Sequence, residues 1–336
     1  MALISIITPA YNAEAWIEAS LESAIAQTHQ DLEIIVIDDG SSDNTADVVT
    51  AIKDSRIRLI RQENGGQSAA ANRGISEAKG DYVKFLDADD ALSPNHLESQ
   101  LAAIHGSKEL LADCAWGYFV EDWQSATTRA ESTNRDFQDP VEWFVESLTQ
   151  NEGMMGGWKW LIPQEIISRA GGWNPKLSLN NDFDFSIRLL LASKGTRWAE
   201  NALYAYRKTT TPSLSGSRSR KAMDSAFLTT KLGCDQLLAR ENSERIRQIC
   251  ADRYQMWLYH FFPEYPDLSQ QTEKAVQELG GSKLALQGGR ALNLLLPVLG
   301  WKNVRRLQTC AYRYGWSSML KRKENKRVER IERRSA

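Results

Sequence analysis

Over the first third of the chain, short apolar runs alternate with helical segments, and this alternation limits the fold more than any other feature. The apolar runs are rich in β-branched residues, which is typical of strands that are buried on both faces. Strands that alternate with helices predict an α/β fold in which helices cover a mostly parallel sheet. In chain order, we expect strands at residues 3–8, 32–37, 57–60 and 82–86, and helices at residues 12–27, 43–52, 67–78 and from 94 onward. We expect Asn12 to cap the first helix.

Polar residues gather where three of these strands end. Tyr11 follows the first strand, Asp39 follows the second, and Asp87 and Asp89 follow the fourth. The carboxyl ends of parallel strands share one edge of a sheet, and ligands bind at that edge. Asp87 and Asp89 are two residues apart, so on extended backbone their carboxylates point the same way and suit a hard cation such as Mg²⁺ or Mn²⁺. The alternative is a solvated turn rich in Asp.

Chain length and charge narrow the class of protein further. A chain of 336 residues is long for one core, so we expect a first domain at residues 1–216 and a helical extension at residues 217–336. The net charge of −2 argues against a nucleic-acid-binding protein. Residues 302–334 are nevertheless basic and follow an apolar stretch at 292–299, a pattern that suits contact with an anionic membrane surface. An ordinary helical extension with a solvated basic tail is the alternative.

The chain shows no sign of export or membrane insertion. No basic leader precedes the first strand, and no stretch is long and apolar enough to cross a bilayer. Cys114, Cys234, Cys250 and Cys310 are widely separated, so we expect reduced, unpaired thiols. These features predict a cytoplasmic protein, with the basic region as a means of peripheral contact with the inner face of the membrane.

Five short motifs together resemble those of a known family. They are SIITPAYN at residues 5–12, IDDGSSD at 37–43, ENGGQSAA at 63–70, NRG at 72–74 and FLDADD at 85–90. Each motif alone is weak, but in this order and spacing the set is similar to glycosyltransferase family 2, whose members have the Rossmann-like GT-A fold. The resemblance covers residues 3–215. It implies a nucleotide-binding half at about residues 1–112 and an acceptor half at about residues 113–216.

The resemblance also implies an activity, which is inverting transfer of a hexose from a nucleotide sugar to a hydroxyl acceptor. By position, Tyr11 resembles the residue that packs on the base, and Asp39 resembles the acid that accepts a hydrogen bond from the base ring. Asp87 resembles the residue that reaches the ribose or the metal, and Asp89, in the DXD motif, resembles the direct ligand of Mn²⁺ or Mg²⁺. The full set of donor-binding candidates is Pro9, Tyr11, Asp39, Gly66, Arg73, Asp87 and Ala88.

The residues themselves are consistent with these roles and with simpler ones. A tyrosine ring beside a strand end offers a flat apolar platform, although a half-buried core tyrosine is equally consistent. An ionised aspartate only accepts hydrogen bonds, which suits the N–H of a base ring. Turn chemistry is the alternative for Asp39, and we prefer it for Asp38.

The acceptor side of the resemblance centres on residues 181–189. Asp182 falls at the position of the family's catalytic base, while Asn181 stands where the family usually has Glu. A role for Asp182 as a first-turn acid of a helix is the alternative. Trp158, Trp160 and Trp173 precede this segment. Aromatic faces stack on the C–H faces of sugars, so these three are candidates to line an acceptor site, and burial in the core is the alternative.

The implied partners are a UDP-, GDP- or dTDP-sugar and a saccharide or lipid-linked acceptor of polysaccharide biosynthesis. Two other classes stay open. A non-catalytic protein that binds nucleotide sugars is one, because Asn181 replaces half of the family's acidic pair. A nucleotidyltransferase on a related sheet is the other, although a Gly-rich phosphate loop is missing after the first strand.

Overall fold

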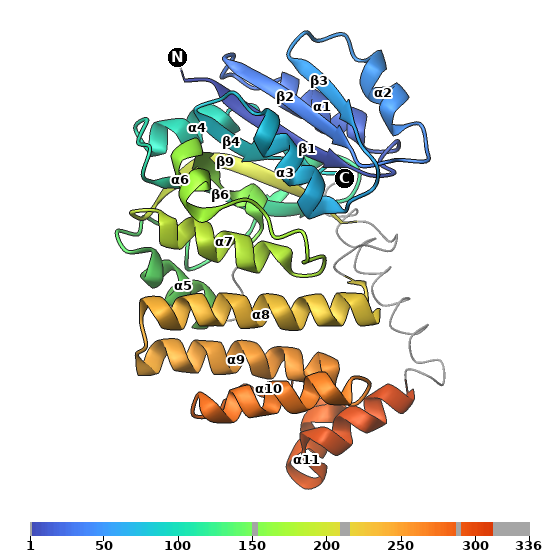
Figure 1. Cartoon of the computed structure of the whole chain (residues 1–336), viewed down its shortest axis with the longest axis vertical. Helices are drawn as coiled ribbons and strands as arrows, with labels where there is room; N and C mark the ends of the chain where they lie inside the picture. The colour runs from blue at the N-terminus through green and yellow to red at the C-terminus, as the bar shows by residue number, and fades with distance from the viewer. Residues whose placement is uncertain (1, 150–153, 209–215, 287–289, 312–336) are drawn as a thin grey trace. The chain divides into compact units, whose positions relative to one another are not determined.

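The computed structural model describes residues 2–149, 154–208, 216–286 and 290–311 (Figure 1). The chain divides into two compact units, one up to Ser215 and one from Gly216 onward. The first unit contains a sheet with helices packed on it, and the second is helical. The α/β prediction is therefore confirmed for the first unit.

A nine-stranded sheet runs through the described part of the first unit, in the order β3-β2-β1-β4-β8-β6-β9-β5, with β7 paired to β6. Strands β3, β2, β1 and β4 are parallel, as expected, while β8 pairs antiparallel to both β4 and β6. The sheet is therefore mixed beyond β4. The bounds are β1 Ile4–Ala10, β2 Leu32–Asp38, β3 Ile57–Arg61, β4 Tyr82–Phe85, β5 Ala91–Leu92, β6 Leu111–Phe119, β7 Thr127–Thr128, β8 Leu161–Pro163 and β9 Thr196–Arg207.

Helices pack closely on this sheet. In α3, a Cβ atom added at Gly74 would lie 2.2 Å from Cγ2 of Ile7 in β1, so the helix approaches the strand at the distance that only glycine permits. The helices of this unit are α1 Ile17–Ile25, α2 Thr45–Ala51, α3 Gln67–Glu77, α4 His96–Ala103, α5 Pro140–Thr149, α6 Gln164–Ala170 and α7 Asn181–Ala192, with 3₁₀ turns η1 Trp123–Ser125 and η2 Gly157–Lys159.

The expected cap at Asn12 is wrong. Helix α1 begins at Ile17, and Asn12 has a left-handed backbone with φ of 50°. Its side-chain oxygen accepts a hydrogen bond from the N–H of Ser42 at 2.9 Å, and its own N–H donates to the Ser41 hydroxyl at 3.0 Å. These bonds fasten the loop after β1 to the loop after β2, because Asn satisfies local backbone groups more readily than it extends a helix.

The second unit consists of helices in its described part. They are α8 Arg220–Arg240, α9 Glu244–Phe261, α10 Pro266–Glu278 and α11 Arg290–Ala311. The hydroxyls of Ser219 and Ser243 cap α8 and α9 by accepting hydrogen bonds from backbone N–H groups three residues on. Helix α11 carries Pro297 and has a non-helical residue, Gly300, with φ of 69°. The basic segment beyond residue 311 lies outside the described residues.

The described residues bear on two expectations, the absence of a membrane-spanning segment and the unpaired cysteines. Within the residues that the structure describes, no helix has the length and apolar character needed to span a bilayer. All four cysteines are unpaired, as predicted, and three of them are buried.

Candidate active site

The strand ends converge as the sequence predicts. Because β1 lies between β2 and β4 and is parallel to both, Tyr11, Asp39 and Asp87 leave the sheet at the same edge. Tyr11 is 55% exposed, so its ring is available as a platform at this edge. The alternative of a half-buried core tyrosine does not fit this exposure.

Asp39 organises the loop that follows β3. Its carboxylate accepts hydrogen bonds from the backbone N–H groups of Gly65 and Gly66 at 2.9 and 2.8 Å, and from the Gln62 amide at 2.7 Å. A carboxylate has about four acceptor positions, so these bonds use most of them, and Asp39 is only 3% exposed. The residue therefore shapes the glycine loop whether or not it also contacts a base. Asp38 makes turn contacts, accepting from the Ser41 N–H at 3.0 Å and from Arg61 at 3.1 Å.

Asp87 and Asp89 form an acidic pair that is only partly exposed. Burial, with the nearby charges of Asp89 and Asp182, raises the pKa of Asp87 to about 8, and burial also raises the pKa of Asp89. Among the described residues, no group of three or more His, Cys, Asp or Glu side chains could hold a metal ion. The oxygen donors of this pair fit Mg²⁺ or Mn²⁺, provided that a ligand's phosphates complete the coordination.

Two residues of β9 hold the acidic loop in place through contacts that were not predicted from the sequence. Arg207 donates from its backbone N–H to the carboxylate of Asp90 and from Nε to the carbonyl of Asp89, both at 2.7 Å. The backbone N–H of Asp87 donates to the Tyr204 hydroxyl at 3.1 Å. Arg207 is 8% exposed and its guanidinium is bound to this loop, so its side chain supports the loop rather than facing the solvent.

Asp182 lies in the first turn of α7 and remains partly exposed. Burial raises the pKa of its carboxyl to about 6, and the N–H of Gly157, which donates to Oδ1 at 2.7 Å, opposes this shift. The carboxyl is close enough to Asp87 to raise that residue's pKa. The Asp182 carboxylate therefore lies near the acidic pair, as the position of a catalytic base requires.

A chain of amides connects α7 to the acidic pair. The Asn181 amide donates to the Ser68 hydroxyl at 3.2 Å and to Oε1 of Gln67 at 3.4 Å, and the Gln67 amide donates to Asp87 at 3.4 Å. A glutamate at position 181 could not donate these bonds when ionised. The departure from the family pattern at Asn181 is thus matched by local hydrogen bonding, and it leaves Asp182 in place.

The three candidate acceptor tryptophans are largely core residues. Trp160 is completely buried against Trp143, with ring centroids 5.1 Å apart, so it has no face for a sugar and its expected acceptor role is wrong. Trp158 stacks on Tyr204 and Trp173 stacks on Phe185, and they are 5% and 6% exposed. A large indole is stabilised by burial of its apolar surface, and burial in the core, the alternative to an acceptor role, therefore applies to Trp160.

Three of the four remaining donor candidates lie at or near the same edge. Pro9 is paired within β1, Ala88 is in the acidic loop, and Gly66 adopts φ of 86° at the start of α3. Arg73, on α3, is half-exposed and forms an ion pair with Glu77 at 2.7 Å. A donor contact from Arg73 would have to compete with this ion pair.

Comparison with known proteins identifies a matching family and several similar proteins. Residues 5–164 match the family described as "Glycosyl transferase family 2". Glycosyltransferase GlyG of Streptococcus pneumoniae serotype 4 is 33% identical over 224 residues, covering 61% of this chain and 71% of that protein. Glycosyltransferase EpsH of Bacillus subtilis is 31% identical over 212 residues, covering 61% of this chain but 60% of that protein.

The fold is also seen in a solved structure. A crystal structure of S. aureus TarS 1–349 in complex with UDP-GlcNAc has a TM-score of 0.60 at 17% identity, covering 82% of this chain and 80% of that one. The fold is the GT-A fold of the glycosyltransferases to which the chain is similar. The chain belongs to glycosyltransferase family 2.

Proposed function

We propose that this protein is an inverting glycosyltransferase that moves a hexose from a nucleotide sugar to a hydroxyl acceptor and depends on a divalent cation. The observation that carries the proposal is the position of Asp182 beside the acidic pair of Asp87 and Asp89. Asp182 has a pKa of about 6, retains some exposure, and lies near Asp87. A carboxylate with a pKa just below neutral is deprotonated at neutral pH yet basic enough to accept a proton.

Each group has a defined task in this proposal. Asp182 accepts the proton of the acceptor hydroxyl, whose oxygen then bonds to the anomeric carbon as the bond to the nucleoside diphosphate breaks on the opposite face. This single displacement inverts the anomeric centre. Tyr11 and Asp39 bind the base, and Asp87 and Asp89 face the ribose and the diphosphate. A divalent cation held by Asp89 would offset the charge that develops on the leaving diphosphate.

The structural neighbours support a first choice of donor to test. TarS was crystallised with UDP-GlcNAc and with UDP. We therefore propose a UDP-sugar as the first donor to test, with GDP- and dTDP-sugars as the other candidates. A saccharide or lipid-linked acceptor of polysaccharide biosynthesis is the acceptor class that we propose.

Nucleotide release in the presence of Mn²⁺ separates an enzyme from a non-catalytic binding protein. Water replaces the acceptor slowly in such an assay, so UDP should accumulate from UDP-N-acetylglucosamine without an added acceptor. A protein that binds UDP with Mn²⁺ but releases no nucleotide from UDP-, GDP- or dTDP-sugars would contradict the catalytic proposal.

The loss of activity at acid pH should report the protonation of Asp182. Because Asp182 acts when deprotonated and has a pKa of about 6, kcat/KM should rise with pH through about 6 and level off above it. Within the described part of the chain, Asp87 and Tyr206 are ionisable groups close to it. The measurement is nucleotide release between acid and neutral pH, and the residual activity of Asp182→Asn should lack this loss. A wild-type rate that is flat across pH 6 would contradict the assignment.

We also propose that helix α11 contacts an anionic membrane surface. Leu294 and Val298, one turn apart, are 77% and 81% exposed, and the neighbouring Leu295 and Leu299 are partly exposed. Lys302 follows on the same helix, and the basic run of the sequence comes after it. Exposed apolar residues next to basic ones suit the boundary between lipid headgroups and acyl chains.

Cosedimentation with lipid vesicles tests this contact. The protein should pellet with vesicles that contain phosphatidylglycerol and remain in solution with phosphatidylcholine alone. The double variant Leu294→Glu with Val298→Glu should lose binding, because each charge removes apolar contact and repels the anionic surface. Leu307→Glu is the matched control, since Leu307 is 52% exposed but follows Gly300 and lies outside the apolar group. Equal binding by all three proteins would contradict the proposal.

A further inference from the structure

The turn that contacts Asp182 has a demanding geometry. Gly157, the first residue of η2, donates its N–H to Oδ1 of Asp182. A Cβ atom at Gly157 would lie 2.6 Å from the ring of Trp173, so the backbone can come this close only as glycine. The N–H fixes one carboxylate oxygen and leaves the other for a ligand. The position of this turn therefore sets the orientation of the Asp182 carboxylate.

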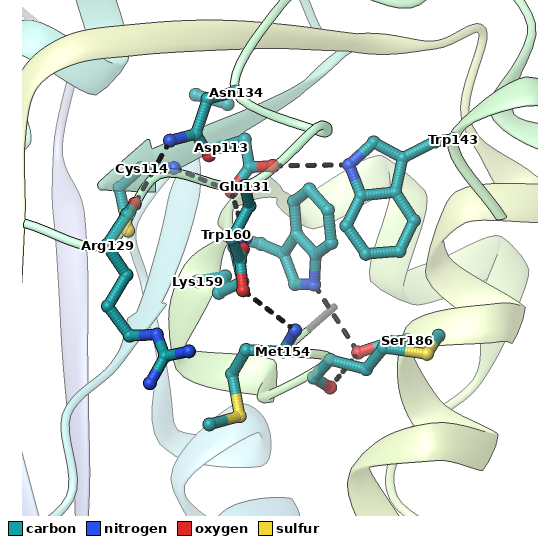
Figure 2. Close-up of polar contacts among 12 residues, drawn as sticks. Asp113, Cys114, Arg129, Glu131, Asn134, Trp143, Met154, Lys159, Trp160 and Ser186 are labelled. Atoms are coloured by element: carbon teal, nitrogen blue, oxygen red, sulfur yellow. Dashed lines mark hydrogen bonds and ion pairs between the residues drawn. The ribbon is translucent and has the colours of Figure 1, made fainter. Parts of the chain in front are cut away.

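A buried ion cluster lies at the other end of the same turn (Figure 2). Nζ of Lys159 lies 3.3 Å from Oδ1 of Asp113 and 3.0 Å from Oε2 of Glu131. The side chains of Lys159 and Asp113 are fully buried, and that of Glu131 is 6% exposed. Burial alone would lower the pKa of Lys159, but the two carboxylates outweigh it and the pKa is raised, so the amine stays charged.

The cluster also holds the approach to the turn. Oε1 of Glu131 accepts a hydrogen bond from the N–H of Met154 at 3.2 Å. The next carbonyl, that of Met155, accepts from the hydroxyl of Ser186 at 2.7 Å. Ser186 lies on α7, one helical turn after Asp182. The segment that leads into the turn is thus tied both to the ion cluster and to the helix that carries the base.

Two further buried side chains bind the carbonyls of the turn. Nζ of Lys84 donates to the carbonyl of Trp158 at 2.6 Å, and the Gln100 amide donates to the carbonyl of Lys159 at 2.8 Å. Lys84 and Gln100 are both fully buried. The backbone carbonyls of Trp158 and Lys159 are therefore both bound by buried side chains, which leaves the turn little freedom to shift.

We propose that Asp113, Lys159 and Glu131 are positioning residues for the reaction, which fix the turn so that Gly157 presents its N–H to Asp182. Stability alone gives a weak reason for such a cluster, because well-packed apolar residues often stabilise a core as much as a buried ion pair does. A cluster that sets the position of a catalytic carboxylate has a specific use. The inference rests on the proposed function of Asp182 as the base.

The test compares Glu131→Ala with Glu131→Gln. Alanine removes the bonds to Lys159 and Met154, while glutamine keeps one oxygen to accept from Lys159. Nucleotide release from UDP-N-acetylglucosamine with Mn²⁺ gives kcat and the donor KM, and calorimetric titration of UDP counts the binding-competent sites. For Glu131→Ala, we expect kcat per competent site to fall roughly 10- to 100-fold at unchanged donor KM. Glu131→Gln should recover part of the rate, because its one oxygen can accept from Lys159 while its NH₂ group meets the N–H of Met154 as a second donor.

The count of competent sites separates positioning from folding. A residue that only stabilises the fold would reduce the number of sites and leave kcat per site at the wild-type value, which would overturn the proposal. Asp54→Ala is the matched control, because it breaks the ion pair of Asp54 with Arg56, between α2 and β3. It should leave kcat per site unchanged.

A second variant covers the case in which Glu131→Ala does not fold. Ser186→Ala removes the bond to the Met155 carbonyl and should also lower kcat per site without changing the donor KM. Normal kcat per site in Ser186→Ala and in any folded Glu131 variant would overturn the proposal. Failure of the underlying function looks different, because the wild type would then release no nucleotide, or Asp182→Asn would release it at the wild-type rate.

Discussion

The variant Asp182→Asn is expected to transfer sugar roughly 10³-fold more slowly than the wild type, with unchanged affinity for UDP. Asparagine keeps an oxygen that can accept the N–H of Gly157, so the turn and the start of α7 should stay in place. It cannot take a proton from the acceptor hydroxyl, and that step provides the expected loss. The measurement is steady-state transfer or nucleotide release, beside calorimetric titration of UDP with Mn²⁺.

A neighbouring acid provides the control. Asp184 also lies in the first turn of α7, but its carboxylate pairs with Arg188 at 2.7 Å on the same helix. Asp184→Asn should retain activity per competent site, even if the melting temperature falls. If both variants lose activity equally, Asp182 acts through the helix rather than on the acceptor, and the assignment of the base is wrong.

The variant Asp89→Ala is expected to lower kcat/KM by roughly 10²- to 10³-fold and to remove the response of the remaining activity to Mn²⁺. Asp89 offers a partly exposed carboxylate at the acidic edge, and its loop is fixed by Arg207 through backbone groups. Removing the side chain should therefore leave the loop in place and take away a cation ligand. The measurement is nucleotide release against Mn²⁺ concentration.

An exposed acid outside the acidic pair serves as its control. Asp47 lies in the first turn of α2 and is exposed. Asp47→Ala should leave both the rate and its dependence on Mn²⁺ unchanged. A wild-type rate that persists after chelation of divalent ions, or an Asp89→Ala variant that still responds to Mn²⁺ as the wild type does, would contradict the role of Asp89.

Local sequence signals predicted the strands and helices of the first third of the chain well. Buried parallel strands are continuous apolar runs, so β1, β2, β3 and β4 could be located within a few residues. The polar residues at their ends then had to share an edge, which brought Tyr11, Asp39 and Asp87 together. Helix α7 and Asp182 were found through the resemblance of motifs, because their spacing from the first half carries no periodic signal.

Contacts between distant segments could not be predicted in this way. Arg207 binds the carboxylate of Asp90 across 117 residues, and Lys159 pairs with Glu131 and Asp113 from three separate segments. Neither hydrophobic period nor turn chemistry encodes such pairings. The expected role of Trp160 failed for a related reason, since an aromatic residue near a site looks the same in sequence whether it faces a ligand or the core.

Calorimetric titration of the wild-type protein with UDP, GDP and dTDP, each with and without Mn²⁺, tests the donor site most directly. The acidic pair and the glycine loop held by Asp39 predict that one of these nucleotides binds, and that Mn²⁺ strengthens its binding substantially. That result would also identify the base of the donor. Binding that is equal with and without Mn²⁺, or no binding of any of the three, would contradict a metal-dependent nucleotide-sugar site at this edge of the sheet.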